Sequence, residues 1–230
     1  MATAPDPFGR KNLAAEIIRV NSENPEPSLI AYVADQLRQG EVLGMPTDTF
    51  YGLAADPINL RAVDRVYDIK SRSRHKPLSL LIASVAQAEA LAKELLPEFY
   101  LLTEKFWPGP LTLIVQAAPG LPLKVTANSG NVALRVPASQ IALAVIRKAE
   151  VPITATSANL SGHSECTTAA AVRDQLGDRL NLIVDGGPSP RSVPSTIVDL
   201  TVESLGHSCW RIQREGAISA KEIQEVLCGQ

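Results

Sequence analysis

The chain has 230 residues, of which 45% are hydrophobic, and this length and composition suffice to bury a large core in one domain. A formal net charge of −2 excludes a general electrostatic attraction to nucleic acid or to an anionic membrane, so any anion site must be local. Three cysteines without CxxC spacing indicate neither a disulfide framework nor a zinc site. No apolar run is long enough to span a bilayer, and we therefore expect a cytoplasmic protein with no membrane partner.

Residues 1–11 are polar and contain prolines, which predicts a mobile N-terminal arm. One domain is expected to follow over residues 12–230, beginning with a strand at Glu16–Val20. In the next segment, SLIAYVADQLRQG, apolar residues recur at helical spacing and Gly40 is placed to end the helix. This segment therefore predicts an amphipathic helix.

The same kind of pattern predicts the remaining elements. Further strands are expected at Val42–Met45, Leu78–Ile82, Leu111–Gln116, Val132–Val136, Ile153–Ala155, Leu182–Asp185, Thr196–Leu200 and Trp210–Gln213. Helices are expected at Leu60–Ile69, from Ser84 to a stop at Pro97, and at Gln140–Ala149, Thr168–Leu176 and Ala220–Leu227. Because strands and helices interleave, the sequence predicts an α/β fold in which helices flank a mixed, largely buried sheet.

Two polar clusters follow predicted strands. GMPTDTFYGL, at Gly44–Leu53, places three hydroxyl-bearing side chains around Asp48. Local turn chemistry is the simplest explanation, since Thr and Asp side chains bond nearby backbone groups. TATSANLSG, at Thr154–Gly162, either forms a cradle for an anion or satisfies its own polar groups within a turn. The two segments taken alone leave these alternatives open.

A basic segment, KSRSRHKPL, lies between a predicted helix and a predicted strand. Its four cations, Lys70, Arg72, Arg74 and Lys76, either are solvated or hold an anion. An extended backbone would place all four on one side, and Pro77 favours that conformation at Lys76. Arg binds phosphate in a bidentate manner and Lys binds it as a point charge, so we expect phosphate here.

The segment DGGPSPRSVPSTIVD, at Asp185–Asp199, is too rich in Gly, Pro and Ser for regular structure and is either a lid or a linker. The chain contains no GxxxxGK[ST] or GxGxxG motif, so the sequence does not support phosphate binding by either of these glycine-rich loops. It also contains no GxSxG or HExxH motif, which are the signatures of serine hydrolases and zinc proteases. The three histidines lack ligand spacing, so no metal site built by the protein is expected.

Eight short motifs resemble, in order and in spacing, the signature series of the YrdC family: PTDTFYGL, KSR with KPL downstream, FWPGPLT, VALRVP, SANLSG, DGGP, STIVDLT and REGAIS. The family comprises L-threonylcarbamoyladenylate synthases, and the match runs from about Glu16 to Ser219. The resemblance is to its short members, which lack an extra C-terminal domain. It implies a twisted sheet that curves around a positively charged cavity.

The resemblance also implies a reaction in which L-threonine, bicarbonate and ATP, with Mg²⁺, give threonylcarbamoyl-AMP and pyrophosphate. A separate transferase would then use the product to modify a tRNA adenosine. The implied threonine contacts are Thr49, Ala155 and Ser195. The implied ATP contacts are Lys70, Arg72, Lys76, Thr112, Ser157, Asn159 and Arg214, of which Lys70 and Arg72 would carry the catalysis.

The chain departs from the family pattern at three positions. Glu165 stands where a hydroxyl is usual and would repel phosphate, Leu81 replaces a His found in some members, and Glu215 replaces a Pro. Arg135 matches a family Arg that either contacts ligand or supports the sheet. Two other functions stay open: a tRNA or double-stranded RNA binding module, which the near-neutral charge disfavours, and a non-catalytic maturation subunit.

Overall fold

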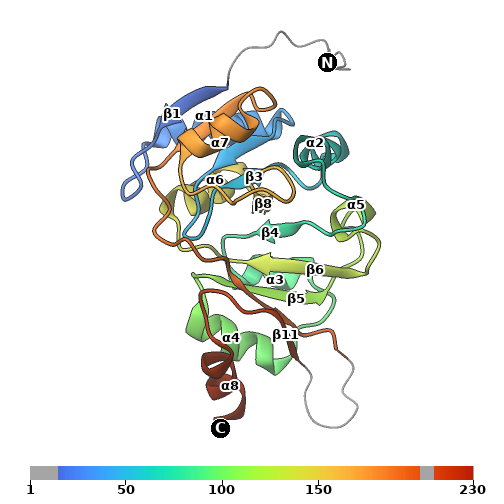
Figure 1. The fold of residues 1–230 in the computed structure, drawn as a ribbon. Coiled ribbons are helices and arrows are strands. Elements are labelled where there is room, and N and C mark those ends of the chain that lie inside the picture. Colours follow the sequence, from blue (N-terminus) through green and yellow to red (C-terminus); the bar gives the residue numbers. More distant parts are fainter. Residues whose placement is uncertain (1–14, 203–209, 230) are drawn as a thin grey trace.

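The computed structural model describes residues 15–202 and 210–229 of the chain (Figure 1). The predicted arm at residues 1–11 lies outside these described residues. Within them, no helix has the length and apolar character needed to cross a membrane.

The described strands form two mixed sheets, where the sequence predicts one. The first sheet has the order β1 (Glu16–Arg19), β9 (Leu182–Asp185), β2 (Leu43–Met45), β3 (Gly52–Ala54) and β8 (Thr156–Ser157). The second has the order β11 (Arg211–Arg214), β10 (Thr196–Asp199), β5 (Leu111–Gln116), β6 (Asn131–Arg135), β4 (Ser79–Leu81) and β7 (Ile153–Thr154). Each sheet combines parallel pairs, such as β1 with β9 and β5 with β10, and antiparallel pairs.

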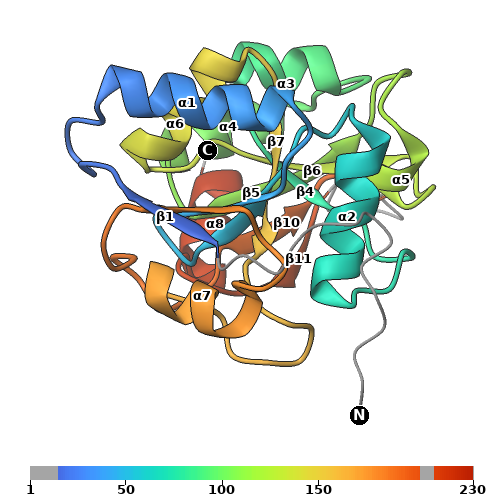
Figure 2. The ribbon, with the colours of Figure 1, turned by 90° about the horizontal axis from the view of Figure 1, so that it is seen from above.

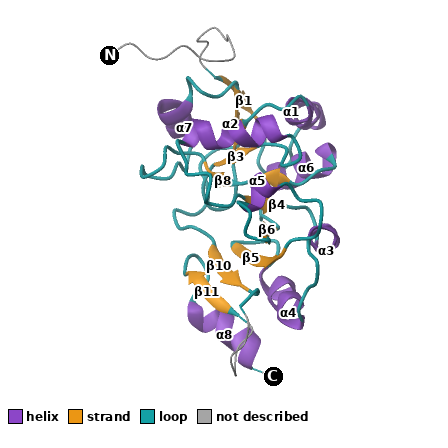
Figure 3. Ribbon diagram, turned by 90° about the vertical axis from the view of Figure 1, so that its right-hand side faces the viewer, coloured by secondary structure: helices purple, strands orange, loops and turns teal. Residues whose placement is uncertain are grey.

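Helices flank the sheets, which confirms the predicted α/β class. They are α1 (Pro27–Arg38), α2 (Leu60–Lys70), α3 (Val85–Leu91), α4 (Pro97–Phe106), α5 (Leu123–Thr126), α6 (Gln140–Ala149), α7 (Ala169–Leu176) and α8 (Ala220–Cys228). Figure 2 shows α1 beside α6 on one side of the first sheet and α7 on the other. In Figure 3, α8 and α4 lie together at the far end of the second sheet.

The alternation of side chains along β9 explains why both faces of the first sheet are covered. Leu182 and Val184 belong to the apolar cluster that α1 and α6 share. Ile183 points to the other face and belongs to the larger cluster that includes α7. A strand buried on both faces is a continuous apolar run, which is how this segment reads in the sequence.

The chain passes from one sheet to the other at Ala155. β7 ends at Thr154 as an edge of the second sheet, and β8 begins at Thr156 as an edge of the first. The backbone N–H of Ala155 donates to the carbonyl of Ser79 at 2.8 Å, and that of Thr154 donates to the carbonyl of Ala55 at 2.9 Å. This crossover brings the ends of strands from both sheets to one place.

The structure confirms most of the expected elements to within one or two residues. The helix predicted from Ser84 to Pro97 is wrong, because α3 ends at Leu91 and Ala92 pairs with Ala117. Pro97 begins α4 instead of ending a helix, since its fixed φ and missing N–H suit the first helical turn. The helix α4 and the short elements β3, β8 and α5 were not among the predictions.

Candidate active site

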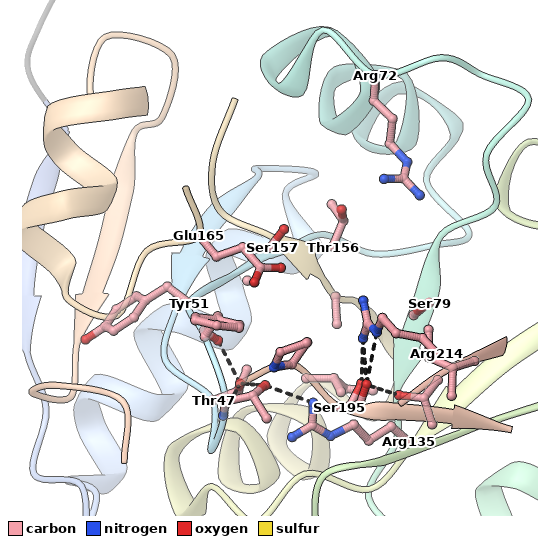
Figure 4. Close-up of a pocket in the computed structure, with 18 residues that line it drawn as sticks. Thr47, Tyr51, Arg72, Ser79, Arg135, Thr156, Ser157, Glu165, Ser195 and Arg214 are labelled. Atoms are coloured by element: carbon pink, nitrogen blue, oxygen red, sulfur yellow. Dashed lines mark hydrogen bonds between the residues drawn. The ribbon is translucent and has the colours of Figure 1, made fainter. Parts of the chain in front are cut away.

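A cavity of about 200 Å³ opens where the two sheets meet (Figure 4). Strands β3 and β8 of the first sheet and β4, β5, β6, β10 and β11 of the second contribute to its wall. Seven of the ten implied substrate contacts line it, as do Leu81, Arg135 and Glu165; the seven are Thr49, Arg72, Thr112, Ala155, Ser157, Ser195 and Arg214. Lys70, Lys76 and Asn159 are not among the lining residues.

The turn between β2 and β3 fixes Thr49 at the cavity. The hydroxyl of Thr47 donates to the carbonyl of Phe50 at 2.7 Å and accepts from the N–H of Thr49 at 3.1 Å. Local turn chemistry, the simplest explanation of this motif, is therefore confirmed for Thr47. Thr47 satisfies the turn, which leaves the side chain of Thr49 beside the cavity, 3.2 Å from the Thr47 hydroxyl.

Arg135 and Asp48 form a buried ion pair behind Thr49. Their side chains are 7% and 1% exposed, and Arg135 Nη2 lies 2.5 Å from Asp48 Oδ1. Arg135 also donates from Nη1 to the Thr49 hydroxyl at 3.0 Å and from Nε to the carbonyl of Gly109 at 2.9 Å. Burial lowers the pKa of Arg135, and the carboxylate of Asp48 opposes that shift. Arg135 thus both supports the wall and lines the cavity.

Lys70 is a second buried cation, and its three N–H groups meet neutral oxygens. Only 2% of the residue is exposed. Its Nζ donates to the carbonyl of Ser157, to the carbonyl of Asn159 at 2.9 Å and to Asn159 Oδ1 at 3.0 Å. Burial, together with the charge of Arg72, lowers the pKa of Lys70 to about 8. Lys70 therefore holds the SAN turn in place from behind, and Ser157 of that turn faces the cavity.

The four cations of the basic segment do not line one side, so that expectation is wrong. α2 continues to Lys70, and Ser71 then adopts a left-handed conformation with φ 51° that ends the helix. The side chain of Arg74 turns outward and donates to Asp68 at 2.9 Å. Lys76 is exposed. The helix thus turns Lys70 inward and leaves the next cations on an irregular, non-extended path.

Arg72 is the member of this segment that reaches the cavity. It donates from Nη2 to the carbonyl of Pro77 at 3.1 Å, and its buried Nε has no hydrogen-bond partner within the described residues. The lining therefore contains three guanidinium groups, those of Arg72, Arg135 and Arg214, and one carboxylate, that of Glu165 (Figure 4). Guanidinium groups with open N–H donors suit a polyanion such as a phosphate chain.

A short chain of hydrogen bonds fixes the opposite wall. The hydroxyls of Thr112 and Ser195 lie 2.9 Å apart, and Arg214 donates to the carbonyl of Ser195 from Nε at 3.1 Å and from Nη2 at 2.8 Å. A Cβ atom on Gly216 would lie 2.2 Å from the carbonyl oxygen of Pro194. Glycine is therefore required for this close approach of the REG segment to Ser195.

Sequence reasoning assigned no substrate contact to several lining residues, although Thr47, Tyr51 and Thr156 belong to the polar clusters that it noted: Thr47, Phe50, Tyr51, Gly52, Ser79, Thr156, Pro194 and Ile197. Four of them belong to the PTDTFYGL motif, so the whole motif, and not one threonine, was the available signal. Tyr51 is fully buried and donates to the carbonyl of Gly187 at 2.7 Å. Burial, with the charge of Asp185, raises the pKa of Tyr51, so it stays a neutral donor.

A comparison with family models supports the reading of these motifs. The model Sua5_yciO_yrdC, described as telomere recombination, matches residues 35–216. The chain belongs to this family. The match covers every cavity residue named above, from the β2–β3 turn to Arg214, and it confirms the resemblance seen in the sequence motifs.

Relatives within the family carry a consistent name. A threonylcarbamoyl-AMP synthase of Pyrococcus abyssi is 38% identical over 207 residues, which are 89% of this chain and 59% of the relative. A threonylcarbamoyl-AMP synthase of Thiobacillus denitrificans is 36% identical over 183 residues, which are 80% of this chain and 95% of the relative. This chain thus spans about three fifths of the first protein and nearly all of the second.

A solved structure shows the same fold. The crystal structure of P. abyssi Sua5 complexed with L-threonine superposes with a TM-score of 0.87 and 38% sequence identity. The match covers 93% of this chain and 61% of the other. The two-sheet arrangement around the cavity is therefore the fold of a relative that binds an amino acid.

Proposed function

We propose that this chain is a threonylcarbamoyl-AMP synthase, which forms threonylcarbamoyl-AMP and pyrophosphate from L-threonine, bicarbonate and ATP. The observation that carries the proposal is the single cavity that gathers three arginines and the hydroxyls of Thr49, Thr112 and Ser195. Relatives that bear this name, one of them matched over nearly its whole length, support it.

The nucleotide is assigned to the side of the cavity that holds Arg72, Ser157 and Arg214. Arg72 brings an unpartnered buried Nε, and partial desolvation lowers the pKa of the Arg214 guanidinium, a shift that an anionic partner would oppose. Lys70 lies directly behind Ser157 and adds positive charge without reaching the cavity surface. We therefore assign Lys70 to the positioning of Ser157 and Asn159, and Arg72 to direct contact with phosphate.

The amino acid is assigned to the side that holds Thr49, Ala155 and Ser195. Threonine offers a hydroxyl, an amine and a carboxylate, and these groups need short polar partners held in fixed positions. The hydroxyl of Thr49 is held by Arg135 Nη1 at 3.0 Å, and that of Ser195 by Thr112 at 2.9 Å. Ala155, at the crossover between the sheets, has a small side chain that leaves room beside them.

The reaction asks little covalent chemistry of the protein. The threonine amine forms an N–C bond with bicarbonate, and water is lost. An oxygen of the resulting carbamate then forms a bond to the α-phosphorus of ATP, and the bond to the β-phosphate oxygen breaks to release pyrophosphate. Charge accumulates on phosphate oxygens near Arg72 and Arg214, whose fixed guanidinium groups stabilise it. Holding the reactants together supplies a further part of the acceleration.

A divalent cation fits this site as a companion of ATP. The described residues contain no group of three or more His, Cys, Asp and Glu side chains that could hold a metal ion by themselves. Mg²⁺ is usually held by one or two carboxylates together with substrate phosphates, and Glu165 supplies one carboxylate in the lining. When bound, Mg²⁺ would neutralise part of the phosphate charge, and the carboxylate of Glu165 would be the group in the lining that could hold the ion.

The proposal includes a cytoplasmic location and transfer of the product to a separate tRNA-modifying transferase. It is supported by the relatives' names, which refer to threonylcarbamoyl-AMP. The competing function is that of a module that binds tRNA or double-stranded RNA, in which the arginines of the same cavity would contact RNA phosphates. A multi-phosphate RNA contact would weaken steeply with salt, whereas binding of ATP in a pocket would not.

The deciding experiment measures pyrophosphate release from ATP by the purified protein with bicarbonate, Mg²⁺ and either threonine, serine or no amino acid. We expect threonine-dependent release. Arg72→Ala should lose most of it, and Lys76→Ala, a matched cation of the same segment outside the cavity, should keep it. Absence of threonine-dependent release from the folded wild-type protein would overturn the proposal, and salt titration of RNA binding would then test the competing function.

A further inference from the structure

The segment 186–195, which joins β9 to β10, passes beside the cavity and carries an arginine to which the sequence motifs assign no role. Arg191 lies in the middle of this segment with its side chain 45% exposed. Its Nη1 is 3.7 Å from Asp48 Oδ2 and donates to the backbone carbonyl of Asp48 at 3.4 Å. The segment is thereby tied to the turn that carries Thr49.

Asp48 is shared by two arginines. Its Oδ1 accepts from Arg135 Nη2 and from the N–H of Ala138 at 3.1 Å. Its Oδ2 is buried and has no hydrogen-bond partner in the described part of the chain, and Arg191 is the cation paired with it. One carboxylate against two guanidinium groups leaves a net positive charge beside Thr49. Without Arg191, the pair of Asp48 and Arg135 would be neutral.

The other hydrogen bonds that tie the segment to the PTDTFYGL motif lie at its start, where the hydroxyl of Tyr51 donates to the carbonyl of Gly187 at 2.7 Å and accepts from the N–H of Gly186 at 3.3 Å. A second cavity, of about 450 Å³, lies between residues 186–190 and the start of α6, with Asp48 in its lining. Ser189 also lines it, and the buried hydroxyl of Ser189 has no hydrogen-bond partner among the described residues. Because this region is not closely packed, an ion pair has a larger share in holding the segment than it would in a packed core.

We propose that Arg191 is a positioning residue for the amino-acid side of the cavity. It acts through Asp48 on Arg135 and Thr49, and it keeps the segment that ends in Ser195 against the β2–β3 turn. The identity of the ligand as an amino acid rests on the proposed function. The electrostatic consequence is specific: the charge of Arg191 favours an anionic group, such as a substrate carboxylate, beside Thr49.

The test compares Arg191→Ala, Arg191→Lys and, as a matched control, Arg173→Ala in steady-state assays that vary threonine and ATP separately. Arg173 is also half-exposed and pairs with a neighbouring aspartate, but it lies on α7 and not at the cavity. We expect Arg191→Ala to raise KM for threonine about threefold to tenfold, with kcat within about twofold and KM for ATP unchanged. Arg191→Lys should restore most of the loss, because a single Nη1 makes the contact with Asp48.

An unchanged KM for threonine in Arg191→Ala, or an equal rise for both substrates, would overturn the inference. Failure of the proposed function itself would appear differently, as wild-type protein that releases no pyrophosphate with threonine. In that case amide hydrogen exchange tests the positioning role without an activity assay. The inference requires that Arg191→Ala accelerates exchange in residues 186–195 and 47–51 and that Arg191→Lys does not. Identical exchange in the wild type and Arg191→Ala would then contradict the positioning role.

Discussion

Two buried cations beside the cavity, Lys70 and Arg135, are accommodated in different ways. Arg135 pairs with the carboxylate of Asp48 at 2.5 Å. Lys70 donates to three neutral oxygens of Ser157 and Asn159, and its pKa falls to about 8 because burial and the charge of Arg72 disfavour the ammonium form. The charge of Arg135 is thus cancelled inside the protein, whereas that of Lys70 is only solvated by dipoles.

Under the proposed function, this difference would allow one cavity to hold two unlike substrates. The Lys70 side, with Arg72 close by, keeps a positive charge that an incoming phosphate chain would neutralise. On the Arg135 side, Asp48 cancels the charge of Arg135, so the positive charge that remains is that of the half-exposed Arg191, and the hydroxyl of Thr49 is available to recognise a small polar molecule by hydrogen bonding. We infer that the two sides differ mainly in what neutralises their cations: the phosphates of the ligand on the nucleotide side, and the carboxylate of Asp48 on the amino-acid side.

The largest expected effect comes from breaking the ion pair. Arg135→Met would leave the buried Asp48 with only the half-exposed Arg191 as a counter-charge, and we expect the free energy of unfolding to fall by at least about 3 kcal/mol. Urea unfolding measures this loss. Arg173→Met, which removes a half-exposed ion pair on α7, should cost less than about 1 kcal/mol. A loss for Arg135→Met no larger than that of the control would show that Asp48 is not a buried charge.

Removing the other cation should cost less. Lys70→Met would leave oxygens of Ser157 and Asn159 without donors, but it would leave no buried charge, so we expect a loss of about 2–3 kcal/mol. The exposed Lys124, which pairs with Asp64, offers a control, and Lys124→Met should change stability by less than about 1 kcal/mol. If Lys70→Met destabilised the protein more than Arg135→Met, the contrast between the two cations would be wrong.

The lowered pKa of Lys70 should also be visible in the pH dependence of stability. In the folded chain the pKa of Lys70 is about 8, whereas in the unfolded chain Lys70 keeps its proton up to its ordinary pKa of 10.5. Between these values the unfolded state binds more protons, so this group makes the free energy of unfolding rise with pH. The wild-type value minus that of Lys70→Met should therefore increase from pH 7.5 through 8.5 to 9.5, as measured by urea unfolding. A difference that stays constant over this range would contradict the assignment.

Periodicity in the sequence was sufficient to predict most of the long elements, with the exception of α4. The helix α6 and the strands β5 and β9 have the expected bounds because their apolar patterns are strong and their ends are marked. The prediction was wrong at Pro97, since proline both follows helix ends and begins helices, and local pattern does not distinguish the two cases. The division of the strands into two sheets depends on the crossover at Ala155, which has no local signal.

The candidate site was predicted through its motifs, but its internal contacts were not. Only the family resemblance predicted that Thr49, Arg72 and Ser157 belong to one site, because these residues are far apart in the sequence. The contact between Asp48 and Arg135 joins residues 87 positions apart, and no pattern in either segment encodes that pairing. Likewise, Lys70 points inward because α2 extends as far as this residue. The prediction that the alternating cations of KSRSRHKPL share one side assumed an extended backbone and was therefore wrong.

The division of the cavity into a nucleotide side and an amino-acid side is tested most directly by steady-state kinetics of Arg72→Ala and Thr49→Val with both substrates varied. The account predicts that Arg72→Ala raises KM for ATP about tenfold or more and KM for threonine less than about threefold. Thr49→Val should show the reverse, since it removes one hydroxyl and no charge. Equal increases in both KM values for both variants would contradict the account, because they would show one shared site without separate sides.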